Sequence, residues 1–374
     1  MRRTEVPIHR PYLGQAELER IAAVLESRWL GSGPVTREFE DRVAALCGAR
    51  NVVAVSSGTA ALQLALHACG LEPGDEVILP SLTFVACSQA IVAAGGRPVY
   101  CDVELKTATI DVASAAERIG PRTRAIMPVH FGGFACDLDA LLELGRTRGV
   151  RVVEDAAHAF GSSFRGSPLG SIGDVTCFSF DPIKNVTCGE GGAVVTADDE
   201  LAGLVRRARG LGVDRDGWTR RDAHRPWHQE AVSFGLRAHM SDLNAAIGLA
   251  QLERLEELRS QRQALLRRYR EGLATVEGVV PQQGDVDTVF PFLALVRVLD
   301  GRRDALLAHL ESEGIRAWVH YLPNHLHQAF ADPASSLPAT ERLFAELLSL
   351  PLYHELAEED VDRIVEAVRA FFDA

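Results

Sequence analysis

The sequence predicts an α/β protein with a mostly parallel, seven-stranded sheet that has helices on both faces, followed by a smaller C-terminal α+β domain. Through the first two-thirds of the chain, apolar β-like runs alternate with helical stretches, a pattern typical of strands buried on both faces. After about residue 240 the pattern changes to long helical spacing with dense charge pairs. We therefore predict a large domain over residues 1–245 and a small domain over residues 246–374.

The elements follow in order along the chain. Strands are expected at 51–57, 76–80, 97–103, 124–130, 150–157, 174–180 and 191–197, with helices at 59–69 and near 84–94. Residues 240–273 are predicted to form one long connecting helix, because their apolar residues have helical spacing and their charges pair at i, i+4. The small domain is expected to hold a strand within 290–298 and helices near 302–314, 340–349 and 359–372.

Composition and charge exclude several classes of protein. The formal net charge of −12 argues against a nucleic-acid partner, which needs a basic face. The first residues lack the apolar core of a signal peptide, and no run of about 18 apolar residues indicates a membrane span. The seven cysteines are scattered without CxxC pairs, which predicts reduced thiols in a cytoplasmic protein and no metal site of the zinc type.

Lys184 is the first candidate for chemistry. It lies in FSFDPIKNVTCGEGG (178–192), and only two of the 39 basic residues, Lys106 and Lys184, are lysines. An arginine stays protonated in proteins, whereas a lysine amine can lose its proton and act as a nucleophile or base. Composition by itself leaves open that this lysine stands in a loop by chance.

Two further segments could hold a ligand. SSGTAAL (56–62) joins a strand to a helix whose N–H groups would suit a phosphate, although Ser57 or Thr59 could simply cap that helix. Asp155 ends a buried strand in VEDAAHAFG (153–161) and needs a partner. It could pair with a protonated ring nitrogen or cap the next helix. A phosphate anchor, an anion and a lysine are together what pyridoxal phosphate (PLP) requires.

These motifs, in this order, resemble the DegT/DnrJ/EryC1/StrS family of sugar aminotransferases, PLP enzymes of the aspartate-aminotransferase-like fold. The resemblance covers nearly the whole chain. The matching segments are SGTAAL, PSLTFVA, AIMPVHFGG, VEDAAHAFG, GDVTCFSFDPIKNVTCGEGG, MSDLNAAIGLAQLERL and LSLPLY. The resemblance implies that the large domain binds PLP.

The resemblance also implies roles for single residues. Lys184 would form the Schiff base with the cofactor, and Asp155 would pair with the pyridinium nitrogen. The phosphate would be held by Gly58, Thr59 and Ser179.

Four further positions carry over with alternatives or departures. Phe84 would stack on the cofactor ring, although core packing is its other reading. His158 stands where the family often has Gln, next to the ring, and could otherwise be a core histidine. Arg237 stands where Asn or Lys is common and would reach the neighbouring subunit's cofactor phosphate or substrate. His325 aligns with a family histidine near the substrate pocket, although it could simply be a polar loop residue.

The implied reaction transfers an amino group from L-glutamate or L-glutamine to a nucleotide-linked keto-sugar, in a homodimer with shared active sites. The product would be an amino-sugar for glycan or secondary-metabolite biosynthesis. One alternative acceptor is a keto-cyclitol of an aminoglycoside-type pathway. A non-catalytic PLP-binding regulator would need an added DNA-binding segment, and a generic nucleotide-binding protein would leave Lys184 and Asp155 unexplained. In the dehydratases of the family a histidine replaces the lysine, which this chain keeps as Lys184.

Overall fold

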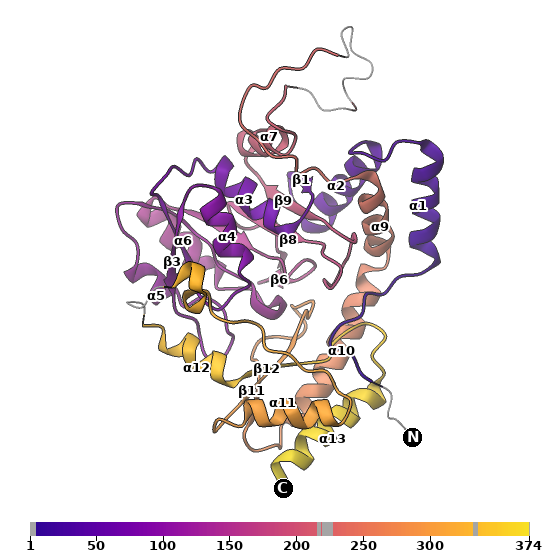
Figure 1. Ribbon diagram of the computed structural model, residues 1–374, viewed down its shortest axis with the longest axis vertical. Coiled ribbons are helices and arrows are strands. Elements are labelled where there is room, and N and C mark those ends of the chain that lie inside the picture. The colour runs from indigo at the N-terminus through magenta and orange to yellow at the C-terminus, as the bar shows by residue number, and fades with distance from the viewer. Residues whose placement is uncertain (1–4, 215–217, 219–226, 332–335, 374) are drawn as a thin grey trace.

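A computed structural model describes residues 5–214, 218, 227–331 and 336–373 of the chain. Its centre is a seven-stranded sheet of order β1-β9-β8-β5-β4-β2-β3 (Figure 1). The strands are β1 (Asn51–Val55), β2 (Glu76–Pro80), β3 (Arg97–Cys101), β4 (Thr123–Ile126), β5 (Arg151–Asp155), β8 (Val175–Ser179) and β9 (Gly192–Thr196). β9 is antiparallel to both of its neighbours, whereas β8, β5, β4, β2 and β3 pair in parallel. The predicted mostly parallel sheet is therefore confirmed.

Helices cover both faces of this sheet because alternate strand residues point to opposite sides. In β1, Val53 and Val55 belong to one core cluster, while Val52 and Ala54 belong to another. The first face is covered by α3 (Gly58–Ala68), α4 (Ala86–Ala93) and α7 (Asp199–Ala208). The second face is covered by α2 (Pro34–Cys47), α5 (Val112–Glu117), α6 (Leu138–Arg148) and α9 (Asp242–Glu253).

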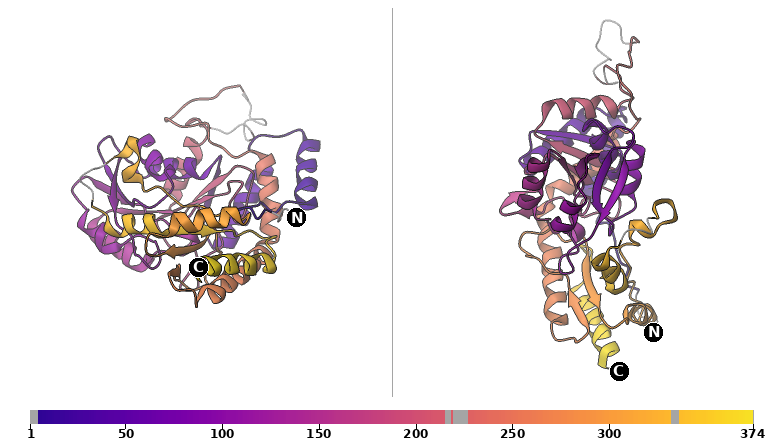
Figure 2. Two further views of the ribbon diagram at one scale, coloured as in Figure 1. Left: turned by 60° about the horizontal axis from the view of Figure 1, so that its bottom comes forward. Right: turned by 90° about the vertical axis from the view of Figure 1, so that its left-hand side faces the viewer.

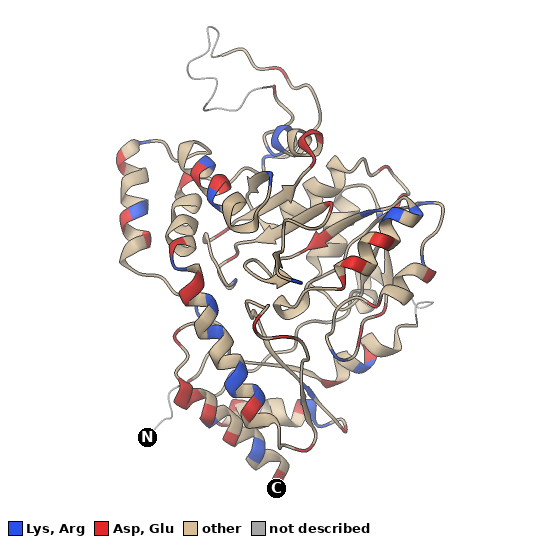
Figure 3. Cartoon of the chain, turned by 180° about the vertical axis from the view of Figure 1, so that it is seen from behind, with Lys and Arg blue, Asp and Glu red and all other residues tan. Residues whose placement is uncertain are grey.

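The predicted single helix over 240–273 is instead kinked between α9 and α10 (Leu255–Leu273) at Arg254, where φ is −114° and ψ is 22°. The guanidinium of Arg254 lies 4.5 Å from the Tyr12 ring centroid and is bonded to Glu17 in α1 (Gln15–Ser27). The Arg254 side chain is thus held by residues near the start of the chain at the position where the helix axis changes direction. Beyond the kink, acidic and basic residues follow one another along α10 (Figure 3).

The C-terminal part has its own antiparallel sheet, β10-β11-β12, which lies below the large sheet in Figure 1 and in the right-hand view of Figure 2. The predicted helix over 340–349 is wrong at its end, because Leu347–Leu350 form a buried strand paired with β11. The elements are β10 (Val279–Pro281), β11 (Ala294–Val298), β12 (Leu347–Leu350), α11 (Arg303–Ser312), α12 (Pro338–Glu346) and α13 (Glu358–Asp373). Two short strands, β6 (Ser163–Phe164) and β7 (Ser167–Pro168), form a separate hairpin.

A third core cluster holds this C-terminal part together, and Val6 from the start of the chain packs into it. The domain boundary between residues 245 and 246 stays a prediction. Val6, which lies in the predicted large domain, packs into the core of the small one. The seven cysteines are free thiols. Among the described helices, none combines the length and the apolar character that crossing a bilayer would take.

Candidate active site

A cavity of about 420 Å³ lies at the carboxyl ends of the large sheet's strands, beside the C-terminal part. Side chains at the ends of β5 and β8, the start of α3 and the loop after β8 all reach it. Its lining includes seven of the sequence-predicted site residues: Gly58, Thr59, Phe84, Asp155, His158, Ser179 and Lys184. The topology thus brings these seven residues to one place, as expected for an open sheet of this kind.

The first turn of α3 forms a narrow cradle with the end of β8. Ser57 caps the helix by accepting the Ala60 N–H at 3.1 Å. A Cβ on Gly58 would lie 2.7 Å from the Ser179 Cβ, so only glycine fits between the helix and the strand. Because the first N–H groups of a helix lack intrahelical partners and carry positive dipole charge, this cradle fits a phosphate group.

Asp155 is a buried carboxylate without a cationic partner at ion-pair distance in the described part of the chain. It is 5% exposed. One carboxylate oxygen accepts the backbone N–H of Ala157 at 2.9 Å, and the other accepts the Cys87 thiol at 2.8 Å. A buried anion of this kind favours a positively charged group beside it. A protonated ring nitrogen would meet that need.

Lys184 follows β8 in a turn in which its backbone N–H donates to the Asp181 carbonyl at 3.0 Å. Its Nζ lies 4.4 Å from the centroid of the Phe292 ring. Burial lowers the pKa of this amine to about 8, although Asp155 and Asp181 act in the opposite direction. A larger fraction of the amine is therefore neutral near pH 7 than for an exposed lysine, which suits a nucleophile or a proton carrier.

His158 is held as a neutral ring with a defined tautomer. Burial, followed by the charge of Lys184, keeps its pKa well below the usual range. The Gly132 N–H donates to Nδ1 at 3.4 Å, so Nε2 carries the proton and faces the Tyr321 hydroxyl at 3.2 Å. His158 therefore offers a hydrogen-bond donor at the cavity, as a glutamine would. Phe84 lines the cavity and is 53% exposed, with its ring centroid 5.4 Å from that of Tyr321. Its exposed surface is available to a planar ligand.

Two sequence-predicted residues are not brought to this cavity. Arg237 is exposed on the segment after α7, where it pairs with Gly210, and it is not among the lining residues. His325 is buried, with Nδ1 2.7 Å from the Ser81 hydroxyl, and it does not line the cavity either. Their substrate and cofactor roles stay predictions.

The sequence reasoning missed several residues that line or support the cavity, among them four with aromatic, imidazole or thiol side chains. Trp318, His320 and Tyr321 come from the C-terminal part and line the cavity. Cys87 does not line it but donates its thiol to the Asp155 carboxylate. The one available signal was the aromatic and histidine cluster in AWVHYLP (317–323), directly before the segment that contains His325. Nothing local in that cluster indicates which of its side chains faces the site.

These residues fit pyridoxal phosphate. The glycine cradle at α3 suits the phosphate, Asp155, which has no cationic partner among the described residues, suits the ring nitrogen, and the exposed Phe84 suits the ring face. Lys184, with its lowered pKa, suits the aldehyde. The donor set is thus the one that this cofactor's functional groups require.

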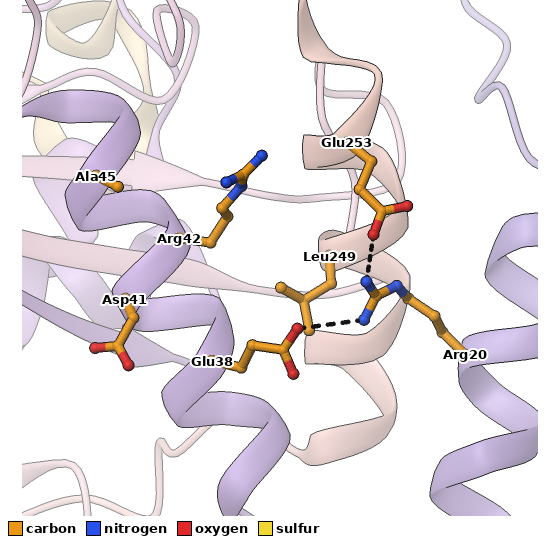
Figure 4. A pocket seen from close by; sticks show the side chains of 7 residues that line it. All are labelled: Arg20, Glu38, Asp41, Arg42, Ala45, Leu249 and Glu253. Atoms are coloured by element: carbon orange, nitrogen blue, oxygen red, sulfur yellow. Dashed lines mark hydrogen bonds and ion pairs between the residues drawn. The ribbon is translucent and has the colours of Figure 1, made fainter.

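A second hollow, of about 490 Å³, lies between α1, α2 and α9 (Figure 4). Arg20 reaches across it to Glu38 at 3.5 Å and to Glu253. Its charged side chains pair largely with one another, and its lining contains no lysine, histidine, cysteine or serine. This hollow therefore lacks the lysine and the glycine cradle that the first cavity combines.

Known proteins are similar to this chain in sequence and in fold over nearly their full length. Residues 11–369 match the family model of the DegT/DnrJ/EryC1/StrS aminotransferase family. The chain is 37% identical to the spore coat polysaccharide biosynthesis protein SpsC of Bacillus subtilis (strain 168), with 97% of this chain and 96% of that protein covered. The Spr1654 protein of Streptococcus pneumoniae in its PLP-form has a TM-score of 0.91 at 29% identity, over 99% of both chains. DesI in the presence of its TDP-sugar product has a TM-score of 0.88 at 34% identity, over 98% of this chain and 93% of that one.

Proposed function

The chain belongs to the DegT/DnrJ/EryC1/StrS aminotransferase family and is a PLP-dependent enzyme, and we propose that it transfers an amino group from L-glutamate or L-glutamine to a nucleotide-linked keto-sugar. The observation that carries this proposal is the convergence of Lys184, Asp155 and the first turn of α3 on one cavity. The amino-sugar product would serve glycan or secondary-metabolite biosynthesis.

Each residue has a distinct role in the proposed reaction. When bound, PLP supplies an electron sink for the charge that develops at the carbon losing its proton. Lys184 Nζ would carry a proton away from the α-carbon of the donor and later return one to the acceptor carbon, and its lowered pKa supports this work. Asp155 would hold positive charge on the ring nitrogen. Phe84 would cover the ring face and exclude water.

The acceptor class is supported by the relative DesI, whose structure was solved with a TDP-sugar product. A keto-cyclitol is the second candidate, and one observation favours it. Besides Lys184 and Asp155, the charged residues in the described cavity lining are Asp181 and Glu190, and no arginine is among them. Outside the α3 cradle, such a lining repels the phosphate groups of a nucleotide and accepts an uncharged acceptor more readily.

A nucleotide-linked acceptor would therefore need positive charge from outside this cavity, and we assign that charge to Arg237 of a second subunit. Arg237 is exposed and lies on the segment that follows α7. The same segment exposes large apolar side chains, with Phe234 at 92% and Trp227 at 74%. Clustered exposed apolar residues are typical of protein interfaces, which supports a homodimer with shared sites. The cytoplasmic location stays a prediction from composition.

A half-reaction titration tests the proposal. We expect L-glutamate or L-glutamine to bleach the visible absorption band of the bound cofactor, and a keto-sugar nucleotide added afterwards to restore it. Restoration by keto-cyclitols alone would move the assignment to the second candidate. If no amino donor bleaches the band, the proposed reaction is wrong.

Substitution of Lys184 tests its role, and the same substitution at Lys106 is the matched control. Lys184→Arg should abolish turnover while the far-UV circular dichroism stays unchanged, because a guanidinium stays protonated. Lys106→Arg, at the other and exposed lysine, should behave like the wild type. Turnover retained by the Lys184→Arg variant would contradict the role of Lys184.

A further inference from the structure

Trp318 reaches the cavity from the C-terminal part on a short extended segment. Its backbone N–H donates to the Ser349 carbonyl at 3.0 Å, and the Ser349 N–H donates back at 2.7 Å. Because successive side chains of an extended segment point to opposite sides, buried Ala317 packs into the core of the C-terminal part, while Trp318 and His320 line the cavity. His320 Nδ1 is also tied to the Ser349 hydroxyl at 2.7 Å. The position of the Trp318 backbone is therefore well defined.

The indole of Trp318 is exposed although its backbone is held. It is 61% exposed, and its N–H makes no hydrogen bond with any described residue. Trp29, by comparison, donates its indole N–H to the Ser32 carbonyl at 3.2 Å. A large aromatic ring left facing a cavity gains free energy when a flat or C–H-rich ring covers it.

The position of Trp318 separates it from the cofactor groups. Asp155, Lys184 and the start of α3 all belong to the large sheet's side of the cavity, whereas Trp318 belongs to the opposite part of the chain. Phe84 already offers a ring face on the cofactor side. A second ligand that enters this cavity after the cofactor could therefore pack against the exposed ring of Trp318.

We propose that Trp318 is a specificity-determining residue that stacks against a ring face of the acceptor. The chemistry it recognises is a flat or C–H-rich apolar face, which either the nucleobase or the sugar ring of a nucleotide-linked sugar can present. This inference rests on the proposed function, because it concerns the acceptor of that reaction. It gives a role in the reaction to one of the residues that the C-terminal part contributes to the cavity.

The test compares Trp318→Ala, Trp318→Phe and the control Leu322→Ala with the wild type. Leu322 is apolar, 41% exposed and on the same segment, but it does not line the cavity. At saturating amino donor, Trp318→Ala should raise the KM for TDP- or UDP-linked keto-hexose about tenfold, the effect of losing one stacking contact. Trp318→Phe should recover most of that loss. The donor half-reaction should keep its rate constant within about twofold in each variant.

Inhibition by TDP and UDP alone distinguishes the two ring faces. If the base stacks on Trp318, the inhibition constant should rise in Trp318→Ala by the same factor as the KM. If the sugar stacks, the KM should rise while the inhibition constant stays unchanged. A KM within about twofold of wild type in Trp318→Ala, or an equal rise in Leu322→Ala, would overturn the proposal. Failure of the proposed function is a separate result, since the wild-type band would then not respond to any amino donor.

Discussion

At the residue scale, burial and charge give two basic side chains different chemistry. Burial lowers the pKa of Lys184 to about 8 and that of Arg262, also buried, to about 10. Only the lysine then has a substantial neutral fraction near neutral pH. The carboxylates of Asp155 and Asp181 act against this shift, so the amine of Lys184 is poised between its charged and neutral forms. A proton carrier works best when its pKa lies close to the working pH.

This pKa predicts how the apoenzyme captures its cofactor. Attack on the aldehyde of added PLP requires the neutral amine, so protonation below the pKa should slow it. The second-order rate constant should rise about tenfold per pH unit below about pH 8 and level off above it. Stopped-flow absorbance measures this rate, with Lys106→Arg as the control that keeps the profile. A flat profile between about pH 6.5 and 9 would show that Lys184 is not the titrating group.

At the scale of elements, the start of α3 depends on its contact with the end of β8. Gly58 and Ser179 lie so close that a side chain on Gly58 would push the helix away from the strand. On the other side, a Cβ on Gly192 at the start of β9 would lie 2.4 Å from the Ser57 carbonyl oxygen. The cradle for an anion is thus built by three elements that approach one another at glycines.

Gly58→Ala should therefore weaken cofactor binding by about tenfold or more, because the added methyl group displaces the N–H groups of α3 from their position. Gly203→Ala is the matched control, since a Cβ at Gly203 in α7 meets only the end of the Arg207 side chain at 3.8 Å. Equilibrium dialysis of PLP against each apoenzyme measures the dissociation constants. Equal affinities for the two variants would contradict the cradle.

A second element-scale feature explains the position of His325. Asn324 beside it is fully buried and donates its amide to the carbonyls of Ser81 and Thr83, at 3.2 and 2.7 Å. Its own oxygen accepts the Ser88 hydroxyl at 2.7 Å. These bonds fasten the segment after Tyr321 onto the loop that leads to Phe84, and they draw His325 toward Ser81 rather than into the cavity.

At the scale of the whole molecule, the cavity lies where the carboxyl ends of the large sheet's strands meet the C-terminal part. Neither part forms the cavity alone, because Lys184 comes from the part with the large sheet and Tyr321 comes from the C-terminal part. Arg237 does not line this cavity and is exposed on a segment that also exposes large apolar side chains. The proposed dimer would bring that arginine to the second subunit's cavity, where the lining lacks an arginine of its own.

Subunit mixing tests this arrangement. Lys184→Ala and Arg237→Ala homodimers should each have low activity, the first because it lacks the amine and the second because acceptor binding is weakened. Hybrid dimers of the two should regain close to half of the wild-type activity per dimer, since one of their two sites receives both intact residues. Activity is measured after subunits are dissociated and reassociated together. Hybrids no more active than the parents would show that Arg237 does not act across the interface.

The positions of α1 and α2 show why part of the fold escaped prediction. The sequence pattern assigns no element to residues 15–47, yet two helices form there. Both begin after a glycine, which has no side chain to mark a helix start. In α1 the local partner is Glu17, whose carboxylate accepts the Gly14 N–H at 2.7 Å. For α2 the cap is Asp242, 209 residues away from Gly33, whose carboxylate accepts the Gly33 N–H at 2.8 Å and the Thr36 N–H at 2.9 Å. A prediction of helix starts that uses only neighbouring residues cannot detect a capping residue so far away in the sequence.

The sequence by itself determined the seven strands of the large sheet in their order along the chain, the helices α3 and α4, and Lys184, Asp155 and the α3 turn as candidates for a site. These depend on periodicity and on residues within a few positions of each other. Only the tertiary structure decided that Trp318 and Tyr321 line the cavity while His325 turns to Ser81, 244 residues away. The physical reason is that packing between distant segments, rather than local preference, chooses which side of an extended segment faces the site.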